Sequence, residues 1–554
     1  MPGLTDRRIG LLFLIFIAAL GAATLRAGWL GAVRAPALKR AAATQQVQTV
    51  ALPAPRGTIT DRNGAVLAVS EPASDVSATP YLVRRPLEAA AKLAPLLGAD
   101  ASDVLAKLSE QTGFVYLARR LPAARADRVA ALEIDGIALT PSSRRTYPRE
   151  WLAAQALGNA SEQPGGGSGL EYGEDEVLRG QDGIRRVVSD ALGEPISIED
   201  ERPTVPGSDI ELTIDAALQE KVESVLDGVG QVYRPARGAT AIVMNPKTSE
   251  ILALANWPRV NANDPGGAPA WAAMNRAVGL NFEPGSTFKA FTVAGALEDR
   301  AVTPETPFFL PAAFTLFDRT LRDSHPRGDV TLTVKQILAQ SSNVGAVKIG
   351  LEIGARRFSQ WVDLFGFGRP TGVVLPGEEQ GIVPTYDEYS GTSILNLPLG
   401  QGESVTAMQM MAAYAAIANG GVLRTPQIVR SVGGERLRTP AGRRVLSEAT
   451  AASVREMLRG VLAAGGTASE ASIEGYDLAG KTGTANKVDA DTGEYSDTRY
   501  IASFFGFAPA SDPELLVSVV VDEPQVAIYG GEVAAPAFQK IVAFALPYLG
   551  IRPS

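Results

Sequence analysis

The chain lacks cysteine entirely and contains a single histidine, His325. The absence of cysteine excludes disulfides, thiolate nucleophiles and cysteine-ligated metal sites, and it is compatible with an oxidising compartment. One histidine cannot supply a zinc site with several histidine ligands, and it makes a Ser-His-Asp triad hard to build. We expect His325, in LRDSHPRGD, to be a surface-loop residue. Any nucleophile here needs another kind of base, and we predict neither a metal nor another cofactor.

The chain also lacks an excess of positive charge. Its 52 Lys and Arg are outnumbered by 60 Asp and Glu, which gives a formal net charge of -8 at pH 7. No basic stripe stands out against this acidic balance, so we expect no nucleic-acid partner. The 554 residues are 45% hydrophobic and 20% charged. These values predict two or three globular domains with enough apolar residues for buried cores.

Long apolar runs are absent except at the N-terminus. Residues 9–25, IGLLFLIFIAALGAATL, carry no charge and precede Arg26 and Trp29, which suit a membrane interface. A cleaved export signal is the alternative, because ALKRAAATQQ offers an Ala-x-Ala pattern, but the apolar run is longer than a typical signal core. We predict an uncleaved transmembrane anchor over residues 9–30. The flanking positive charges do not decide its orientation.

Two soluble regions follow the anchor. The first extends to residue 205 and contains a hairpin signal at Asn63–Gly64 and helical spacing between about residues 84 and 140. The second, 206–554, begins with an amphipathic helix after Asp215 and a hairpin around NPKTS. Three strand-like segments near its end precede a closing helix. We predict an α/β (α+β) fold in which helices cover an antiparallel sheet.

The segment EPGSTFKAFT, residues 283–292, places Lys289 three residues after Ser286. Ser is a favoured N-cap residue, so an ordinary helix start is one interpretation. The other is a nucleophile and its base, because residues i and i+3 share a helix face and the apolar continuation predicts a buried lysine. Burial and a nearby cation lower the pKa of a lysine from about 10.4, which lets the amine accept a proton.

Two later segments can complete such a site. AGKTGTA places Lys481 on a predicted strand as the candidate second cation, followed by residues that an extended peptide can approach. AQSSNVG offers the hydroxyl of Ser341 and the amide of Asn343 where a helical run breaks. A turn or a strand end explains each segment alone. The three segments in this order are improbable by chance.

The ordered set resembles the Ser-x-x-Lys, Ser-x-Asn and Lys-Thr-Gly signature of penicillin-recognising serine enzymes. With RGTITDRNG, GSGLE, NPKTSEILALA, GQGESVTAMQ and YGGEVAAPAF, the resemblance to class B penicillin-binding proteins covers nearly the whole chain. YGGEVAAPAF and ASFFGFAPA are closer to the septal, FtsI-like branch than to the elongation branch. The resemblance implies the penicillin-binding transpeptidase fold, an N-terminal anchor and a mostly extended β/α pedestal domain.

The resemblance also implies roles for the first two motifs. Ser286 would attack the D-Ala-D-Ala carbonyl of a peptidoglycan stem peptide and form an acyl-enzyme, while Lys289 takes the serine proton. Ser341 would relay a proton to the leaving amine, and Asn343 would hold the substrate peptide.

For the third motif, the resemblance implies that Lys481 lowers the pKa of Lys289 and attracts the substrate carboxylate. Thr482 and Thr484 would bind that end of the substrate, and Gly483 would let its backbone approach. The backbone N–H groups of Ser286 and Thr484 would form the oxyanion hole.

The implied organisation is a cytoplasmic tail (1–8), an anchor (9–30), a non-catalytic dimerisation-type pedestal (31–205) and a transpeptidase domain (206–554). The protein would be a single-pass protein of the cytoplasmic membrane with an extracytoplasmic catalytic domain. Implied partners are stem peptides, lipid-linked precursor strands, a SEDS-type (FtsW-like) glycosyltransferase and divisome membrane proteins, with β-lactams as covalent inhibitors.

We therefore predict a serine D,D-transpeptidase of septal cell-wall synthesis. An elongation-type transpeptidase is one alternative. A D,D-carboxypeptidase or a β-lactamase would share the motifs but lack the anchored pedestal. A penicillin sensor or divisome scaffold would keep the motifs without turnover.

Overall fold

A computed structural model describes residues 3–30, 47–161, 167–189, 195–317, 319–489 and 492–553. The chain forms two compact units, each assembled from several segments. Unit 1 contains Met1–Pro55, Glu71–Arg144 and Gly180–Gly207, and unit 2 contains Arg56–Ser70, Arg145–Arg179 and Ser208–Ser554. Unit 2 thus includes two segments, 56–70 and 145–179, that the predicted boundary at residue 205 assigns to the pedestal.

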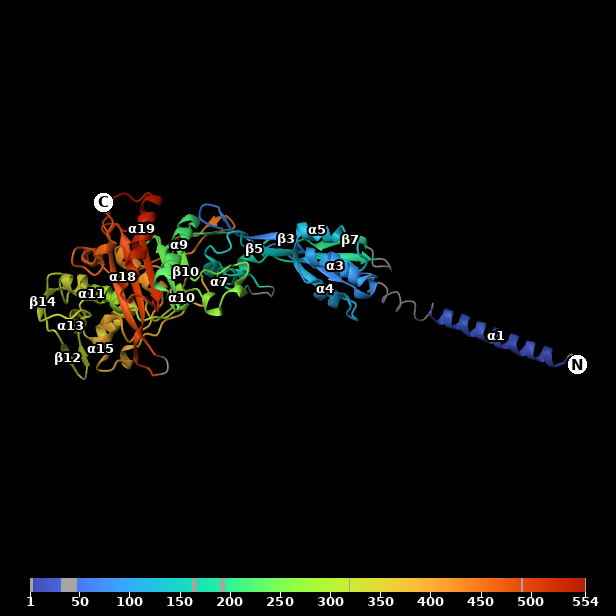
Figure 1. The fold of residues 1–554 in the computed structure, drawn as a ribbon, viewed down its shortest axis with the longest axis horizontal. Coiled ribbons are helices and arrows are strands. Elements are labelled where there is room, and N and C mark those ends of the chain that lie inside the picture. Colours follow the sequence, from blue (N-terminus) through green and yellow to red (C-terminus); the bar gives the residue numbers. More distant parts are fainter. Residues whose placement is uncertain are drawn as a thin grey trace. The chain divides into compact units, whose positions relative to one another are not determined.

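The apolar N-terminal segment forms one helix, α1 (Gly3–Trp29), as Figure 1 shows. Within it, Ile9–Trp29 has a hydropathy of 2.2 in its most apolar window, and none of that window is buried. By length and composition this helix can cross a membrane, which is consistent with the predicted anchor. The Ala-x-Ala segment behind the export-signal alternative lies outside the described residues.

Besides α1, unit 1 contains two sheets and three α-helices, α3, α4 and α5, among its described residues. One sheet has the order β1-β6-β7, and in the other β3 pairs with β4 and β5. The helices bury Leu93 and Val104 against Val76 and Leu117 of this second sheet. Helices α3 and α5 confirm the helical spacing, although β4 separates them. The bounds are β1 (Val47–Leu52), β3 (Val66–Ala78), η2 (Pro80–Leu82), α3 (Pro86–Leu97), α4 (Ala101–Leu108), β4 (Val115–Pro122), α5 (Ala123–Ala130), β5 (Ile137–Thr146), β6 (Gly183–Ser189) and β7 (Pro195–Arg202).

The predicted Asn-Gly hairpin is confirmed, and its turn explains why residues 56–70 belong to unit 2. Strand β2 (Ile59–Thr60) pairs antiparallel with the start of β3, and Gly64 adopts a φ of 84° in the turn. The Asp61 carboxylate accepts the N–H groups of Asn63 and Ala65 at 2.8 Å and that of Ala216 at 3.0 Å. The turn therefore also caps the helix that begins at Ala216.

A buried ion cluster holds residues 145–179 in unit 2. The Glu171 carboxylate is fully buried and accepts from Arg145 Nε at 2.6 Å and from Arg56 Nε at 3.0 Å. Arg56 also pairs with Asp175, and the Tyr147 hydroxyl lies 3.4 Å from Glu171. RGTITDRNG and GSGLE, far apart in sequence, therefore meet at one carboxylate.

Replacement of Glu171 by glutamine is expected to destabilise unit 2. The amide keeps the size of the side chain but leaves two guanidinium groups facing a neutral partner, and breaking a buried ion pair costs about 3–5 kcal/mol in the free energy of unfolding. Thermal unfolding of the full chain in detergent measures the effect. The exposed neighbour Glu176→Gln is the control, and equal melting temperatures for both variants would contradict the role of the cluster.

The main sheet of unit 2 has five antiparallel strands in the order β10-β9-β21-β20-β19. It confirms the predicted hairpin and the three late strands. Residues of β9 alternate between the two cores: Ala241 and Val243 face one, and Ile242 and Met244 face the other. The strands are β9 (Gly238–Met244), β10 (Ile251–Trp257), β19 (Ala479–Val488), β20 (Tyr495–Ala508) and β21 (Leu515–Asp522).

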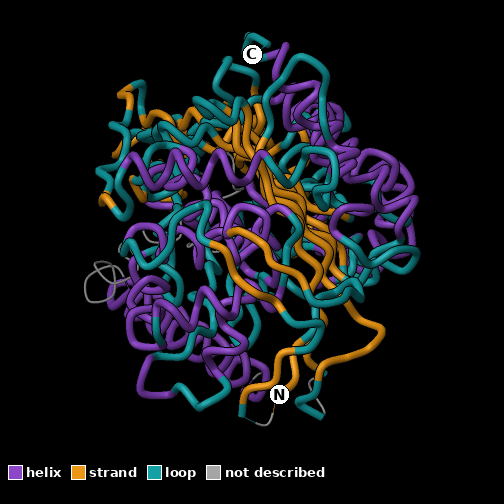
Figure 2. The backbone as a smooth tube through the Cα atoms, turned by 90° about the vertical axis from the view of Figure 1, so that its left-hand side faces the viewer, coloured by secondary structure: helices purple, strands orange, loops and turns teal. Residues whose placement is uncertain are grey.

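Helices cover both faces of this sheet, as predicted and as Figure 2 shows. On one face lie α9 (Ala216–Tyr233), which Asp215 caps, and α19 (Ala535–Tyr548). On the other face lie α11 (Lys289–Glu298) and α16 (Ala407–Ala418). The apolar, alanine-rich and methionine-rich sequence of α16 suits a helix that is buried on all sides.

The remaining elements of unit 2 connect this sheet and its helices. They include a second sheet in which β17, β16, β8 and β2 are neighbours. Their bounds are α6 (Ala154–Leu157), α7 (Gly169–Gly173), α8 (Asp175–Leu178), β8 (Ile210–Leu212), η3 (Pro265–Gly267), η4 (Ala270–Ala272), α10 (Arg276–Gly279), η5 (Gly285–Phe288), β11 (Pro307–Leu310), β12 (Phe314–Leu316), β13 (Arg319–Leu321), β14 (Val330–Thr333), α12 (Val334–Ala339), α13 (Asn343–Ile353), α14 (Ala355–Leu364), η6 (Tyr386–Glu388), α15 (Ser393–Asn396), η7 (Leu397–Leu399), β15 (Val422–Leu423), β16 (Val429–Val432), β17 (Glu435–Arg436), β18 (Arg443–Arg444), α17 (Glu448–Arg459), η8 (Ser469–Ala471) and α18 (Gly530–Val533).

Candidate active site

Ser286 lies inside a short 3₁₀ turn and does not cap a helix. The turn η5 has Pro284 at its N-cap, and α11 has Phe288 there, with no side-chain cap hydrogen bond at either position. This contradicts the N-cap interpretation. The side chain of Ser286 is half-buried, and its hydroxyl makes no hydrogen bond with any described residue. It is therefore available to a ligand.

The turn that carries Ser286 lies directly against the Lys-Thr-Gly strand. Gly285 has a φ of 54°, and a Cβ added there would lie 3.2 Å from Ala485 Cβ and 3.4 Å from Thr484 O. A Cβ on Gly483 would lie 2.8 Å from the methyl group of Thr287. Glycine at both positions lets the first and third motifs come into contact.

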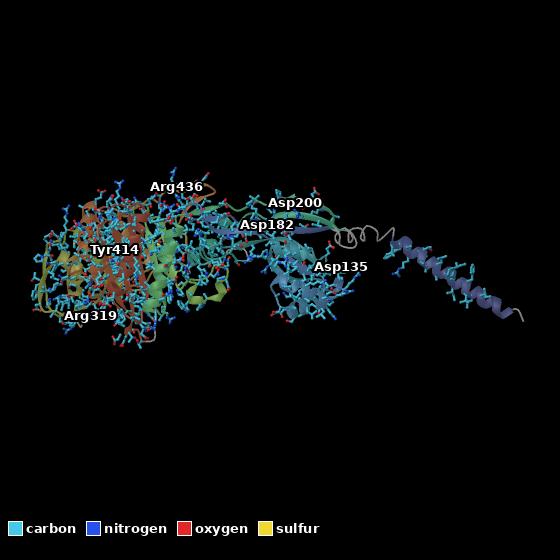
Figure 3. All side chains as sticks on the ribbon, turned by 45° about the horizontal axis from the view of Figure 1, so that its top comes forward. Asp135, Asp182, Asp200, Arg319, Tyr414 and Arg436 are labelled. Carbon is cyan, nitrogen blue, oxygen red and sulfur yellow. The ribbon has the colours of Figure 1, made fainter. Side chains whose placement is uncertain are left out.

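Tyr414 of α16 contacts the same turn from the interior of unit 2. Its ring stacks on Phe505 of β20 at 5.2 Å between centroids, and its hydroxyl donates to Thr287 O at 2.7 Å. Tyr414 is fully buried, and Figure 3 labels it within the body of unit 2. The buried helix and the sheet thus hold the backbone beside Ser286.

Lys289 joins the first motif to the second. Its side chain is 1% exposed, as the sequence predicts. Its Nζ donates to Ser341 O at 2.6 Å, to Asn343 Oδ1 at 2.7 Å and to Ser341 Oγ at 3.3 Å. All three predicted motifs therefore converge on the first turn of α11.

The second motif lies at the predicted break between two helices. Helix α12 ends at Ala339, Ser341 takes a φ of 58°, and the Ser342 hydroxyl caps α13 by accepting from Gly345 N at 3.0 Å. The left-handed residue reverses the chain between the helices. This reversal directs both Ser341 and Asn343 to Lys289.

Asp323 is a site residue that the sequence analysis does not identify. Its Oδ1 accepts from Asn343 N at 2.6 Å and from Val344 N at 3.0 Å, and its Oδ2 accepts from the Ser342 hydroxyl at 2.9 Å and from Arg327 Nε at 2.6 Å. Burial raises the pKa of Asp323, but these hydrogen bonds and Arg327 outweigh it and hold the pKa below its usual range. An anion at the start of α13 is favourable because the helix N-terminus is positive.

Replacement of Asp323 by asparagine is expected to slow acylation by penicillin about tenfold or more, because a neutral amide loses the helix-dipole and Arg327 attractions that hold Ser341 and Asn343 in place. The rate of adduct formation on the full chain in detergent measures this change. The matched control is Asp329→Asn, which alters another carboxylate of the same loop that accepts only a backbone N–H. A native acylation rate in Asp323→Asn would contradict the positioning role.

The two buried lysines differ in their electrostatic surroundings. Burial lowers the pKa of Lys289 to about 7, against the opposing charge of Asp323. Burial lowers the pKa of Lys481 well below its usual value, and the charge of Lys289 lowers it further. Among the described residues, Lys481 donates to Thr482 O at 3.2 Å and to Thr482 Oγ1 at 3.5 Å, whereas Lys289 has three acceptors. The structure thus lowers the pKa of both amines, with the charge of Lys289 acting on Lys481, whereas the family resemblance implies that Lys481 lowers the pKa of Lys289.

The two threonines of the third motif also make hydrogen bonds within unit 2. Thr482 Oγ1 lies 2.8 Å from Thr467 Oγ1, and Thr484 Oγ1 accepts from Gly530 N at 3.0 Å. Among the described strands, β19 is the last of its sheet and pairs only with β20. Its other edge can receive an extended peptide by strand addition.

Comparisons with known proteins match two regions of the chain to two protein families. Residues 239–543 match the Penicillin binding protein transpeptidase domain, and residues 51–212 match the Penicillin-binding Protein dimerisation domain. The chain is 34% identical to the penicillin-binding protein PbpB of Mycolicibacterium smegmatis, over 96% of this chain and 89% of that protein. It is 32% identical to the peptidoglycan D,D-transpeptidase FtsI of Escherichia coli K12, over 95% and 89%.

A solved structure shows a similar arrangement. The crystal structure of penicillin binding protein 3 from Mycobacterium tuberculosis complexed with aztreonam aligns with a TM-score of 0.72 at 28% identity, and the alignment covers 91% of this chain and 98% of that one.

Proposed function

Because this chain belongs to the class B penicillin-binding proteins and is a peptidoglycan D,D-transpeptidase, we propose that Ser286 is its acyl-accepting nucleophile. The observation that carries the proposal is the environment of Lys289. This amine is buried one helical turn after Ser286 and has a pKa of about 7, so a large neutral fraction exists at neutral pH. Its neutral form accepts the serine proton.

Acylation then follows from the three motifs. The Oγ of Ser286 bonds to the D-Ala-D-Ala carbonyl carbon, and its proton moves to Lys289. The backbone N–H groups of Ser286 and Thr484 stabilise the oxyanion. Ser341, 3.3 Å from Lys289 Nζ, passes the proton to the departing amine as the C–N bond breaks and terminal D-Ala leaves. An amine of a second stem peptide attacks the acyl-enzyme and forms the cross-link.

The substrate peptide adds as an antiparallel strand to the free edge of β19. Lys481 attracts its terminal carboxylate when protonated, and Thr482 and Thr484 bind that end by hydrogen bonds. Gly483 lets the peptide backbone approach the strand closely. Asn343, fixed by Lys289 and by its donation to Arg322 O at 3.0 Å, orients the peptide from the opposite wall.

Turnover distinguishes this reaction from that of a penicillin sensor. A stem-peptide thioester analogue should release its leaving group over many equivalents with the native full chain and not with Ser286→Ala. Release that stops at one equivalent would support a sensor.

We further propose that the enzyme acts in septal wall synthesis. YGGEVAAPAF and ASFFGFAPA, together with the likeness to FtsI, support this role. The proposed topology has residues 1–8 in the cytoplasm, a span over residues 9–30 and an extracytoplasmic catalytic domain. The pedestal (31–205) would contact an FtsW-like glycosyltransferase and divisome membrane proteins, and the transpeptidase domain (206–554) would act on lipid-linked precursor strands and be acylated by β-lactams.

Depletion followed by microscopy tests the septal role. A septal enzyme is expected to leave filamentous cells with unfinished septa. Rod cells that become round would instead support the elongation role.

A further inference from the structure

Two carboxyl groups, those of Glu283 and Glu403, lie beside the segment that leads into Ser286. Glu283 lies three residues before the nucleophile, and its Oε1 accepts from Gly402 N at 2.9 Å and from the Tyr495 hydroxyl at 3.1 Å. Glu403 directly follows Gly402 and is 2% exposed. The backbone contact at Gly402 therefore places two acidic side chains together next to the catalytic turn.

These two carboxyl groups hold three buried oxygen atoms without a hydrogen-bond partner among the described residues. They are Glu283 Oε2 and both side-chain oxygens of Glu403. Buried polar atoms in folded proteins are nearly always paired, so three orphaned acceptors in one place require an explanation. Carboxylates only accept hydrogen bonds, whereas a protonated carboxyl group also donates one. A single proton on Glu403 would make it a hydrogen-bond donor, for which Glu283 Oε2 is an unpaired buried acceptor.

The surroundings decide which group carries the proton. Burial raises the pKa of Glu403 well above its usual value, and the charge of Glu283 raises it further. Burial also raises the pKa of Glu283, but Gly402 N–H, the Tyr495 hydroxyl and the charge of Arg319 oppose this effect. Arg319 donates to Gln401 at 3.3 Å and lies at the margin of unit 2 in Figure 3.

The remaining titratable neighbour of Glu403 is Tyr389, whose pKa rises to about 12 because of burial and of Glu403. It stays neutral at physiological pH and adds no charge. Glu283 has hydrogen-bond donors and a nearby cation, which favour its ionised form. Glu403 has neither among the described residues, which favours its protonated form. Two carboxyl groups in one buried site commonly share one proton.

The pair lies between two segments that present the nucleophile. Gly285 N donates to Gly400 O at 2.9 Å, and Phe282 and Val405 exchange backbone hydrogen bonds of 2.9 and 3.0 Å. Glu283 and Glu403 therefore extend a ladder between residues 282–285 and 400–405. A repulsive pair of anions here would push apart the two segments that hold Ser286.

We propose that Glu403 is a protonated acid that donates a hydrogen bond to the Glu283 carboxylate, and that this pair is a positioning element for the turn that presents Ser286. The positioning role rests on the proposed function of Ser286, whereas the shared proton does not. The pair would keep the two segments together while it holds one proton and loosen them when it loses that proton.

Infrared difference spectroscopy tests the shared proton without reference to catalysis. The spectrum of the native full chain minus that of Glu403→Gln, in detergent at neutral pH, is expected to contain a C=O band of a protonated carboxyl group that shifts in D₂O. Absence of this band would overturn the proposal. If penicillin proved to acylate a residue other than Ser286, the band would remain, so the two failures are distinguishable.

Acylation by penicillin tests the positioning role. Glu403→Gln keeps an N–H donor and is expected to acylate within about threefold of the native rate, whereas Glu403→Leu removes the donor and should be at least about tenfold slower. A native rate in Glu403→Leu would overturn the positioning role. Added Na⁺ or Ca²⁺ at constant ionic strength distinguishes a bound cation. If the acylation rate of the native chain rose with the cation and that of Glu403→Gln did not, the proposal would be overturned in favour of a bound cation.

The pH dependence of stability provides a third readout. Because the pKa of Glu403 is raised in the folded state, its contribution is fully favourable below the unfolded value of about 4.3 and is lost as the pH rises through the folded value. The melting temperature of Glu403→Gln relative to the native chain should therefore increase with pH. A constant difference between about pH 5 and pH 9 would overturn the proposal.

Discussion

Replacement of Lys289 by methionine is expected to slow acylation by penicillin about 10²–10⁴-fold, the usual contribution of a positioned acid or base. Methionine fills a similar volume but cannot accept the Ser286 proton. It also leaves Ser341 O and Asn343 Oδ1 without the donor that they have in the native structure. The rate of covalent adduct formation on the full chain in detergent measures this effect.

The matched control is Lys335→Met, which changes an exposed lysine of α12 that pairs with Glu305 at 3.3 Å. This variant should acylate at the native rate. If Lys289→Met reacted as fast as Lys335→Met, the serine proton would have another acceptor and the proposed role of Lys289 would be wrong.

The same proposal predicts the direction of the pH dependence. Burial lowers the pKa of Lys289 to about 7, so the amine is protonated below that pH and cannot take the serine proton. The acylation rate of the native chain should rise about tenfold per pH unit below about pH 7 and level off above it. A rate that stays constant from about pH 5.5 to pH 8.5 would contradict the neutral amine as the base.

Gly483→Ala is expected to produce the second largest loss of activity. The added Cβ would lie 2.3 Å from Ser503 Oγ, 2.8 Å from Thr287 Cγ2 and 3.1 Å from Pro284 O. Relief of these contacts must move β19 away from the Ser286 turn, and a displacement near 1 Å in an active site costs about 10²-fold in rate. Acylation by penicillin measures the loss.

A second glycine supplies the control for this substitution. Gly228 lies in α9, and a Cβ added there meets no atom within 4 Å. Gly228→Ala should therefore leave acylation unchanged and raise the melting temperature slightly, because alanine favours the helix. Overpacking should lower the melting temperature of Gly483→Ala by an amount equivalent to about 1–3 kcal/mol. If Gly483→Ala were acylated at the native rate, the close contact between the first and third motifs would not be needed for activity, and this prediction would be wrong.

Periodicity and turn chemistry predict much of the fold from the sequence. The continuous apolar runs of β9, β20 and β21 are typical of a sheet buried on both faces, and the Asn63–Gly64 turn predicts the hairpin. The three catalytic motifs are local patterns, so the sequence alone indicates their residues. Their convergence at Lys289 is a tertiary fact that the structure adds.

Other features depend on contacts between distant segments and have no local signal. Asp323 lies in a polar loop 18 residues before Ser341 in the sequence, and only the folded chain brings it to the start of α13. Glu171 likewise gathers Arg56 and Arg145 from remote segments. Ser286 occupies a 3₁₀ turn and not a cap, because Gly285 adopts a left-handed conformation that brings the turn against β19.

The order of the two lysine pKa values also depends on the fold. The sequence places two lysines in one site, but it does not indicate how many acceptors each will find. Lys289 has three acceptors and lies in the field of Asp323, whereas the acceptors of Lys481 among the described residues both belong to Thr482. Burial is common to both amines, and the difference lies in the charges: Asp323 raises the pKa of Lys289, whereas Lys289 lowers the pKa of Lys481.

The location of the penicillin adduct tests the central claim most directly. The native full chain, treated with a penicillin and digested with trypsin, should carry one drug on the peptide of residues 277–289, AVGLNFEPGSTFK, whose only serine is Ser286. Ser286→Ala should carry none. An adduct on the peptide of residues 336–348, which contains Ser341, or on native and Ser286→Ala chains alike, would contradict Ser286 as the nucleophile.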